Sequence, residues 1–303
     1  MDRLDAMRVF VMVADLRGFA AAARALRMSP PAVTRAVVAL ERRIGARLLE
    51  RTTRNVRLTE AGERFHADCK RLLAELEEAE ASAGGAHAEP RGLLCVTAPT
   101  MFGRLHVTPV LMDFLALHPK LTARTFFVDR IVHLVDEGYD VAVRIARLPD
   151  SSLTAIPVGQ VRVVVVASPA YLAAHGEPVH PRDLDGLPAI GFSQLGGAPA
   201  PWEFGLPGGD KYAAQPQIPL VVNLPDVSVA AAVAGRGVVR VMSYQVAEHV
   251  RAGRLRVLLR DYEPPARPVH LVYPAGRHAP AKVRAFVDYA AQRLRAELAQ
   301  LDP

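Results

Sequence analysis

Hydrophobic and polar positions between Ser29 and Gly45 recur with the period of an α-helix. The aliphatic residues are spaced by four, three and four positions, which predicts one face that packs inward; they are Val33, Val37, Leu40 and Ile44. Ser29 can cap the N-terminus, Pro30 suits the first helical position, and Gly45 can end the helix with a positive φ. The opposite face is expected to be exposed, and it carries Thr34, Arg35, Val38 and Arg42.

Two shorter helices are predicted before this one and a hairpin after it. Residues 2–16 and 19–26 show helical spacing of apolar residues, and Gly18 separates them. Only Arg27 and Met28 lie between the second helix and Ser29, so a tight turn must join the helices. A helix, a tight turn and a second, basic helix form the helix-turn-helix arrangement. Two short strands around a polar turn follow and would form a wing.

A long helix is predicted from Thr59, which can cap it, to Ala81. Its apolar positions alternate by four and three, which is a heptad seam; they are Leu58, Gly62, Phe65, Cys69, Leu72, Leu76 and Ala79. Such a stripe either packs on its own domain or pairs with a second copy of itself. The segment that follows, up to Pro90, contains two adjacent glycines and is expected to form a hinge-like linker.

From Arg91 the pattern changes to strands that alternate with helices. The predicted strands are Leu93–Ala98, Thr122–Val128, Asp140–Ile145, Val161–Ala167, Leu220–Asn223, Val238–Met242, Arg254–Leu258 and His270–Tyr273. The predicted helices are Leu105–Leu117, Ile131–Glu137, Pro169–His175, Asp226–Ala234, Tyr244–Ala252 and Ala281–Leu301. This alternation predicts βαβ units and parallel sheets. Two lobes fit better than one, with crossovers near residues 157–161 and 264–270.

The positive charge is concentrated near the N-terminus. The 303 residues carry a net charge of +6, and ten arginines against two glutamates fall between Arg17 and Arg57. That block therefore carries +8 and the remainder −2. A basic block in one small domain is typical of a surface that binds a polyanion. A solvated basic face is the alternative, although such faces usually mix both signs.

The exposed face of the helix in residues 29–45 has chemistry that suits the DNA major groove. Arginine reads guanine or grips phosphate, threonine contacts either, and valine can touch a thymine methyl group. The only cysteines are Cys69 and Cys95, which are far apart and without metal-like spacing, as expected for a reducing cytoplasm. No apolar run reaches the roughly 20 residues that a membrane helix needs.

The segment GFAAAARALRMSPPAVTRAVVALERRIGARLLERTTRNVRLTEAGERF resembles the winged helix-turn-helix of LysR-type transcriptional regulators. Two departures from that family are Gly18-Phe19-Ala20, where members commonly have Ser or Thr, and Pro30, where many carry Gln. Three later segments resemble the effector-binding domain of the same family; they are VDEGYDVAVRIARLPDSSL, VVVVASPAYLAAHGEPVHPRDL and MSYQVAEHVRAGRLRVLLRDYEPPARPVHLVYP. That domain is similar in fold to periplasmic solute-binding proteins, with a ligand cleft between two lobes.

The resemblance implies an α+β multidomain fold. Residues 1–58 would form the winged helix-turn-helix, and residues 59–90 the linker helix, which dimerises the family, with its hinge. Residues 91–303 would form the two-lobed α/β effector-binding domain. Within it, the expected division is lobe I in 91–160 and 268–303, and lobe II in 161–267.

Three sets of site residues follow from the pattern and the resemblance together. The DNA-binding set is Ser29, Pro30, Pro31, Thr34, Arg35, Val38, Arg42, Arg51, Thr53, Arg54 and Arg57. The effector-binding set is Thr100, Met101, Phe102, Arg144, Phe192, Asn223, Pro225 and Asp226. The dimerisation set is Phe65, Cys69, Leu72 and Leu76. For each effector candidate, a helix cap or a surface turn is an equally good explanation of the residue alone. Trp202, in an insert rich in Pro and Gly, is either a packing anchor or part of a lid.

The sequence favours a regulator over an enzyme. Gly191-Phe192-Ser193-Gln194-Leu195 lacks the second glycine of a nucleophile elbow, and Gly235-Arg236-Gly237 lacks the third glycine of a dinucleotide fingerprint. We therefore expect a sequence-specific DNA-binding transcriptional regulator in the cytoplasm, with no cofactor, no metal and no membrane partner. Its expected partners are double-stranded DNA with an interrupted palindrome, a small-molecule effector that could be an anion, and further copies of itself as a dimer or tetramer. RNA polymerase is a further candidate partner. The alternatives are an effector-independent DNA binder and an α/β enzyme tethered to DNA.

Overall fold

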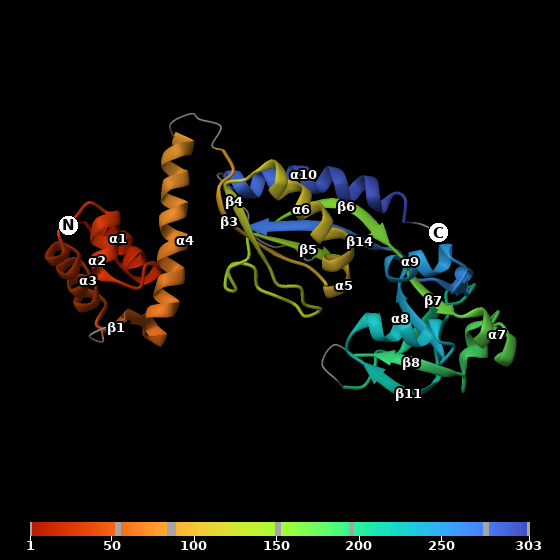
Figure 1. Cartoon of the computed structure of the whole chain (residues 1–303). Helices are drawn as coiled ribbons and strands as arrows, with labels where there is room; N and C mark the ends of the chain where they lie inside the picture. Colours follow the sequence, from red (N-terminus) through yellow and green to blue (C-terminus); the bar gives the residue numbers. More distant parts are fainter. Residues whose placement is uncertain are drawn as a thin grey trace. The chain divides into compact units, whose positions relative to one another are not determined.

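The computed structural model describes residues 2–51, 56–83, 89–148, 153–193, 197–274 and 279–301, without the side chains of residues 51, 71, 74, 75 and 77–83. The chain forms two compact units, residues 1–88 and 89–303 (Figure 1). Among the described residues no helix is both long and apolar enough to cross a membrane. No group of three or more His, Cys, Asp or Glu in those residues could hold a metal ion.

The first unit is a three-helix head followed by a hairpin and a long helix. Its elements are α1 (Arg3–Asp15), α2 (Phe19–Ala25), α3 (Pro30–Ile44), β1 (Leu49–Arg51), β2 (Val56–Leu58) and α4 (Glu60–Ala83). The strands pair antiparallel, as expected for a wing. Phe10, Val13, Val33 and Val37 form the centre of the head core and are fully buried. The core fixes one face of α3 and leaves the other face exposed.

Both ends of α3 lie where the sequence predicts them. Pro30 is the first helical residue, and Gly45 ends the helix with a φ of 76°. Ser29 occupies the N-cap position, but its side chain makes no capping hydrogen bond. The spacing predicts Ile44 inside the core, yet it is 39% exposed because it lies on the last turn, beyond the core residue Leu40.

The start of α4 is fixed against the head by a close backbone approach. Thr59 caps the helix, accepting a hydrogen bond from the Gly62 N–H at 2.9 Å. A Cβ atom at Gly62 would lie 1.9 Å from the carbonyl oxygen of Leu48, so only glycine fits there. His66 and Lys70 contact one carboxylate oxygen of Asp15 in α1, at 2.9 Å and 2.8 Å.

The heptad seam of α4 is shared between the head core and the surface. Cys69 is fully buried in the head core and Phe65 packs against that core. Burial raises the pKa of the Cys69 thiol to about 11. Cys69 therefore offers no surface to a second chain, and the prediction that it lines a dimer seam is wrong. Leu72, which is 41% exposed, and Leu76, which is half-buried, remain available.

The second unit begins with a five-stranded sheet. In spatial order its strands are β4 (Leu121–Thr125), β3 (Gly92–Thr97), β5 (Val141–Ile145), β14 (Arg267–Pro274) and β6 (Leu153–Val161). A continuous helical stretch follows β3; it comprises α5 (Thr100–Phe102), a π-helical turn (Gly103–Val107) and α6 (Thr108–Leu117). Figure 1 shows α6 beside α10 (Ala281–Leu298), which packs on this sheet.

A second five-stranded sheet forms the other lobe. In spatial order its strands are β11 (Gln217–Val222), β8 (Pro188–Phe192), β12 (Val238–Met242), β7 (Val163–Ala167) and β13 (Arg256–Leu258). Its helices are α7 (Pro169–His175), α8 (Pro225–Val233), α9 (Ser243–Arg251) and short 3-10 turns at Pro181–Leu184 and Arg260–Tyr262. A hairpin of β9 (Trp202–Gly205) and β10 (Lys211–Ala214) packs on it, and Trp202 is buried in that core as a packing anchor.

The chain crosses between the two sheets twice. Only Arg162 separates β6 from β7, and the segment before β14 makes the return. The Arg162 guanidinium contacts both carboxylate oxygens of Glu263 at 2.8 Å, so one ion pair ties the two crossovers together.

Several expected elements differ from the structure. Both sheets are mixed rather than parallel, because β14 runs antiparallel to β5 and β6, and β7 runs antiparallel to β12 and β13. Periodicity did not indicate the strands β6, β8, β9 and β10, which are short or interrupted by Pro and Gly. Residues 131–137 do not form the expected helix: residues 131–133 have no regular structure and residues 134–138 form a turn. There the Glu137 carboxylate accepts from the His133 N–H, which a continuing helix would bond to a carbonyl.

Candidate nucleic-acid interface and effector cleft

The outward face of α3 is exposed and basic. Pro31, Arg35, Val38 and Arg42 are exposed, and Val38 presents 36% of its surface. Ser29 and Pro30 are also exposed, at the N-terminal end of the helix. These side chains stand on a helix whose opposite face is locked into the core, so they form a rigid reading surface of the kind that enters a major groove.

Thr34 has a different environment from its neighbours on α3. It is half-buried, and its hydroxyl donates to the Pro30 carbonyl at 3.0 Å. A hydroxyl that is bonded to the preceding turn is a poorer donor to a base. Arg35 is therefore a stronger candidate for base contact than Thr34.

The wing carries the remaining DNA-binding candidates. In β2, Arg57 is exposed and lies opposite Glu50 of β1. Thr53 and Arg54 lie outside the described residues, as does the side chain of Arg51. Arg57 is thus the wing residue that the structure shows to be accessible.

Thr100 begins the helical stretch after β3, ahead of the predicted start at Leu105, and is half-buried. Its N–H donates to the Asp129 carboxylate at 3.1 Å, and its hydroxyl lies 3.5 Å from the Phe127 carbonyl oxygen. Asp129 was missed by sequence reasoning, since nothing in its local pattern connects it to a helix 29 positions earlier. The backbone N–H of this predicted effector residue therefore has a carboxylate partner within the protein.

Met101 and Phe102 do not line a cleft. Met101 is 6% exposed and Phe102 is fully buried in the core of the first lobe. The Phe102 ring packs against Tyr244 of α9, with ring centroids 5.1 Å apart. Both residues are packing residues, because the helix turns them toward the sheet and the adjacent lobe, and their assignment as effector contacts is wrong.

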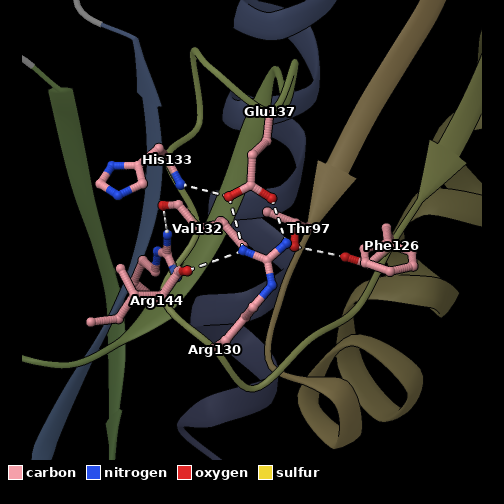
Figure 2. Close-up of polar contacts among 8 residues, drawn as sticks. Thr97, Phe126, Arg130, Val132, His133, Glu137 and Arg144 are labelled. Atoms are coloured by element: carbon pink, nitrogen blue, oxygen red, sulfur yellow. Dashed lines mark hydrogen bonds and ion pairs between the residues drawn. The ribbon is translucent and has the colours of Figure 1, made fainter.

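Arg144 lies on β5 opposite His270 and is half-buried. Its guanidinium donates to the Val132 carbonyl at 2.5 Å, and burial lowers its pKa. Val132 belongs to the loop between β4 and β5. Figure 2 shows that Arg130 also holds this loop, because its guanidinium contacts the Glu137 carboxylate through two nitrogens, at 2.9 Å and 2.6 Å. The Arg130 hydrogen bond lowers the pKa of Glu137 to about 2. Arg144 therefore fastens the loop that follows β4.

The candidates on the second lobe fall into two groups. Asn223 and Asp226 are exposed and Phe192 is half-buried, whereas Pro225 is buried. The Asp226 carboxylate forms an ion pair with Arg104 of the first lobe at 2.9 Å. This contact brings the start of α8 to the helical stretch that contains Thr100. Pro225 serves as the first residue of α8 and not as an exposed contact.

Two hollows lie elsewhere in this unit. One, of about 380 Å³, is lined by Ala146, Arg147 and the segment 264–268. The other, of about 640 Å³, lies between β6, the crossovers and the C-terminal end of α10. None of the predicted effector residues lines either hollow. The inter-lobe contact at Asp226 and these hollows are therefore separate features.

Comparison with known proteins agrees with this architecture. Residues 4–63 match the family described as "Bacterial regulatory helix-turn-helix protein, lysR family", and residues 87–295 match the "LysR substrate binding domain". An HTH-type transcriptional repressor of Pseudomonas aeruginosa strain UCBPP-PA14 is 36% identical over 95% of this chain and 91% of its own length. The regulator DmlR of Escherichia coli K12 is 32% identical over 95% of this chain and 94% of its own length.

Solved structures show the same arrangement. CrgA, a LysR-type transcriptional regulator from Neisseria meningitidis, matches with a TM-score of 0.61 and 28% identity, covering 96% of this chain and 98% of that chain. The Vibrio cholerae virulence activator AphB, described as a member of the LTTR family, matches with a TM-score of 0.60 and 26% identity, covering 96% and 99%.

These matches define a helix-turn-helix transcriptional regulator with a C-terminal substrate-binding-type domain, not an enzyme. The chain belongs to the LysR family. The resemblance and the fold class inferred from the sequence are thereby confirmed.

Proposed function

We propose that this regulator reads a specific DNA sequence with the exposed face of α3 and that a small molecule between its C-terminal lobes controls the outcome. The observation that carries the first part is the contrast within α3. One face is buried in the head core, and the other exposes Arg35, Val38 and Arg42 in a block of positive charge. Arg57 and the other wing residues of the DNA-binding set would hold the phosphate backbone.

The test is a footprint of the full chain on the intergenic DNA upstream of its own gene. A protected, interrupted palindrome that resists competitor DNA is the expected result. Uniform protection that any DNA removes would identify a sequence-independent binder instead. Such binding would contradict the proposal, because base contacts and not phosphate contacts carry sequence information.

We further propose that two copies pair through the second half of α4, by way of Leu72 and Leu76. Leu72 is 41% exposed, and a leucine of that exposure on a long helix is best buried against a partner. Dimers, or tetramers made from two dimers, would place two heads on the two halves of a palindrome. A charge at a buried interface has no partner and is strongly disfavoured.

Leu72→Glu should therefore give monomers in analytical ultracentrifugation and lose binding to a two-half-site operator. Lys70→Glu would add a charge on the same helix at a residue that is 51% exposed, but it is a poor control for Leu72→Glu because it also breaks the contact between Lys70 and Asp15. Leu72→Gln is the matched variant, since it keeps the helix and adds no charge. An intact Leu72→Glu dimer would show that α4 does not provide the interface.

The effector is proposed to bind where α8 of one lobe approaches the helical stretch of the other. Support comes from the Arg104–Asp226 ion pair, which spans the two lobes at 2.9 Å and would respond to any change in their separation. A ligand that changes operator affinity must have its own affinity changed equally by operator. We propose that the protein acts in the cytoplasm, where it meets DNA, and that a bound complex presents RNA polymerase with a surface that activates or blocks it.

A further inference from the structure

Two arginines of the head have a backbone conformation that residues with a side chain rarely adopt. Arg17 lies just after α1 with a φ of 48°, and Arg27 lies just after α2 with a φ of 52°. A positive φ brings the Cβ atom close to the following carbonyl oxygen, which costs free energy in any residue but glycine. Arginine at either position therefore lowers folding stability relative to glycine.

The hydrogen bonds around both arginines are those of a common helix end. After α2, the N–H groups of Arg27 and Met28 donate to carbonyls of the last helical turn, at 3.2 Å and 2.9 Å. After α1, the N–H groups of Arg17 and Gly18 do the same, at 3.2 Å and 3.1 Å. This arrangement is the Schellman motif, in which the residue with positive φ is usually glycine.

Other helices of the same chain use glycine at such an end. Gly235 after α8 and Gly253 after α9 have φ values of 72° and 67° in the same hydrogen-bonded motif. Gly45, which ends α3, has a φ of 76°. Ending a helix therefore does not require arginine, and what distinguishes Arg17 and Arg27 from these glycines is a guanidinium group.

Neither guanidinium has a partner within the described part of the chain. Both side chains are exposed, and there they make no hydrogen bond or ion pair. No acidic residue lies between Asp15 and Glu41 in the sequence. Asp15 contacts His66 and Lys70, and the Glu41 carboxylate accepts from two backbone N–H groups at the start of the hairpin. Both guanidinium groups are therefore free to bind an external anion.

The two arginines stand at opposite ends of α2, the helix that precedes α3. In a helix-turn-helix the helix before the recognition helix crosses the DNA backbone. α2 has seven residues and is therefore about 10 Å long.

The start of α3 offers no backbone N–H to a phosphate. Pro30 and Pro31 have none, and the next two N–H groups donate to the Ser29 carbonyl at 2.9 Å and 3.1 Å. A phosphate beside this turn must therefore be held by side chains.

We propose that Arg17 and Arg27 bind two phosphates of the DNA backbone, one at each end of α2. The stability lost at each helix end is offset by a charge-assisted contact that forms only in the complex. These contacts add affinity without reading sequence. The inference rests on the proposed function for the placement of α3 in the groove, whereas the phosphate contacts can be measured on DNA of any sequence.

The test uses the full chain and a fluorescein-labelled duplex of random sequence. Fluorescence anisotropy at several salt concentrations gives the slope of log affinity against log salt, and thermal unfolding gives Tm. Arg17→Gly and Arg27→Gly should each lower the slope by about 0.9 per bound head, which corresponds to an affinity loss of about five-fold at physiological salt. Both variants should also raise Tm, because glycine removes the backbone strain.

Two kinds of control separate a phosphate contact from a structural role. Arg17→Lys and Arg27→Lys keep the charge and the strain, so both slope and Tm should stay at the wild-type values. Arg3→Gln removes an exposed charge from the first residue of α1, and the 13 residues of that helix place it about 20 Å from Arg17. It should leave the slope unchanged.

Glycine variants that are more stable yet bind random DNA with the wild-type slope would show that the two arginines only end helices, and would overturn the inference. An equal fall of the slope in Arg3→Gln would do the same, because it would reveal a general effect of charge on the head. A lower Tm in the glycine variants would contradict the strain argument. The proposed function fails by a different result: a wild type that does not prefer operator over random DNA, which leaves these salt slopes unaffected.

Discussion

Four arginines of the C-terminal unit and five arginines of the head show two different uses of this residue. In the C-terminal unit, Arg104, Arg130, Arg162 and Arg256 each form an ion pair with a carboxylate. In the described part of the head, five exposed arginines of α3, the hairpin and the segment between them form no ion pair; these are Arg35, Arg42, Arg43, Arg47 and Arg57.

This difference separates arginines whose intramolecular ion pairs stabilise the fold from exposed arginines that can bind an external anion. The ion pairs of Arg104, Arg162 and Arg256 join segments far apart in the sequence, whereas that of Arg130 closes a loop. An unpaired cluster on one face repels itself and attracts a polyanion.

The largest effect is expected on the free energy of unfolding, when an arginine in an intramolecular ion pair is replaced. Arg162→Gln leaves the carboxylate of Glu263, which is 11% exposed, without its partner. Removing one member of a buried ion pair costs about 3 kcal/mol of unfolding free energy. Urea unfolding of the full chain measures the change. Arg256→Gln breaks an exposed pair with Glu177 and should cost less than about 1 kcal/mol. Equal losses of unfolding free energy in Arg162→Gln and Arg256→Gln would contradict the stabilising role assigned to the Arg162–Glu263 pair.

An exposed arginine without an ion pair should contribute to recognition of the DNA sequence and not to the free energy of unfolding. Arg35→Ala should reduce the preference for operator over random DNA by about 1–3 kcal/mol, the value of a bidentate base contact. Its unfolding curve should stay unchanged, because the side chain is exposed. Dissociation constants on both DNAs provide the measurement. An equal loss on both would assign Arg35 to the phosphate backbone.

The wing should contribute through charge alone. Arg57→Ala should lower the slope of log affinity against log salt by about 0.9, since one phosphate contact is lost. Titrations at several salt concentrations on operator and random DNA test this, and both slopes should fall together. Arg293→Gln, on the C-terminal unit, serves as the charge control. An unchanged slope for Arg57→Ala would exclude that side chain from the interface.

The smallest effect concerns the loop held by Glu137. Its pKa falls from 4.5 to about 2 on folding, chiefly through the Arg130 hydrogen bond. A depressed carboxyl pKa stabilises the fold above pH 4.5, and this contribution disappears as the pH falls toward 2. The difference in Tm between wild type and Glu137→Gln should therefore be present at about pH 6 and vanish on acidification. A difference that persists at pH 2 would show that shape, not charge, holds the loop.

The head was largely predictable from its sequence because its determinants are local. The spacing of Val33, Val37 and Leu40 identified the buried face of α3, and Gly45 marked its end. The prediction that Ile44 is buried was wrong because the sequence period does not show where the neighbouring helices end. The prediction that Cys69 lines a dimer seam was wrong for a related reason: a heptad seam identifies a buried stripe but not the surface that covers it.

The C-terminal site was less predictable because its contacts are distant in the sequence. Helical and strand periods found β12 and α7 to the residue, yet they could not show that Asp129 holds the Thr100 N–H or that Arg144 meets the Val132 carbonyl. Phe102 follows Thr100 by two positions on a helix, which directs it into the core.

The central claim is that α3 reads sequence and not only charge. Repeated selection from a random DNA pool by the full chain, at physiological salt and with sequencing of the bound fraction, tests it and does not require a known operator. We expect enrichment of one interrupted palindrome, with the enrichment lost in Arg35→Ala. A bound pool that keeps the random composition of the starting pool would contradict the claim.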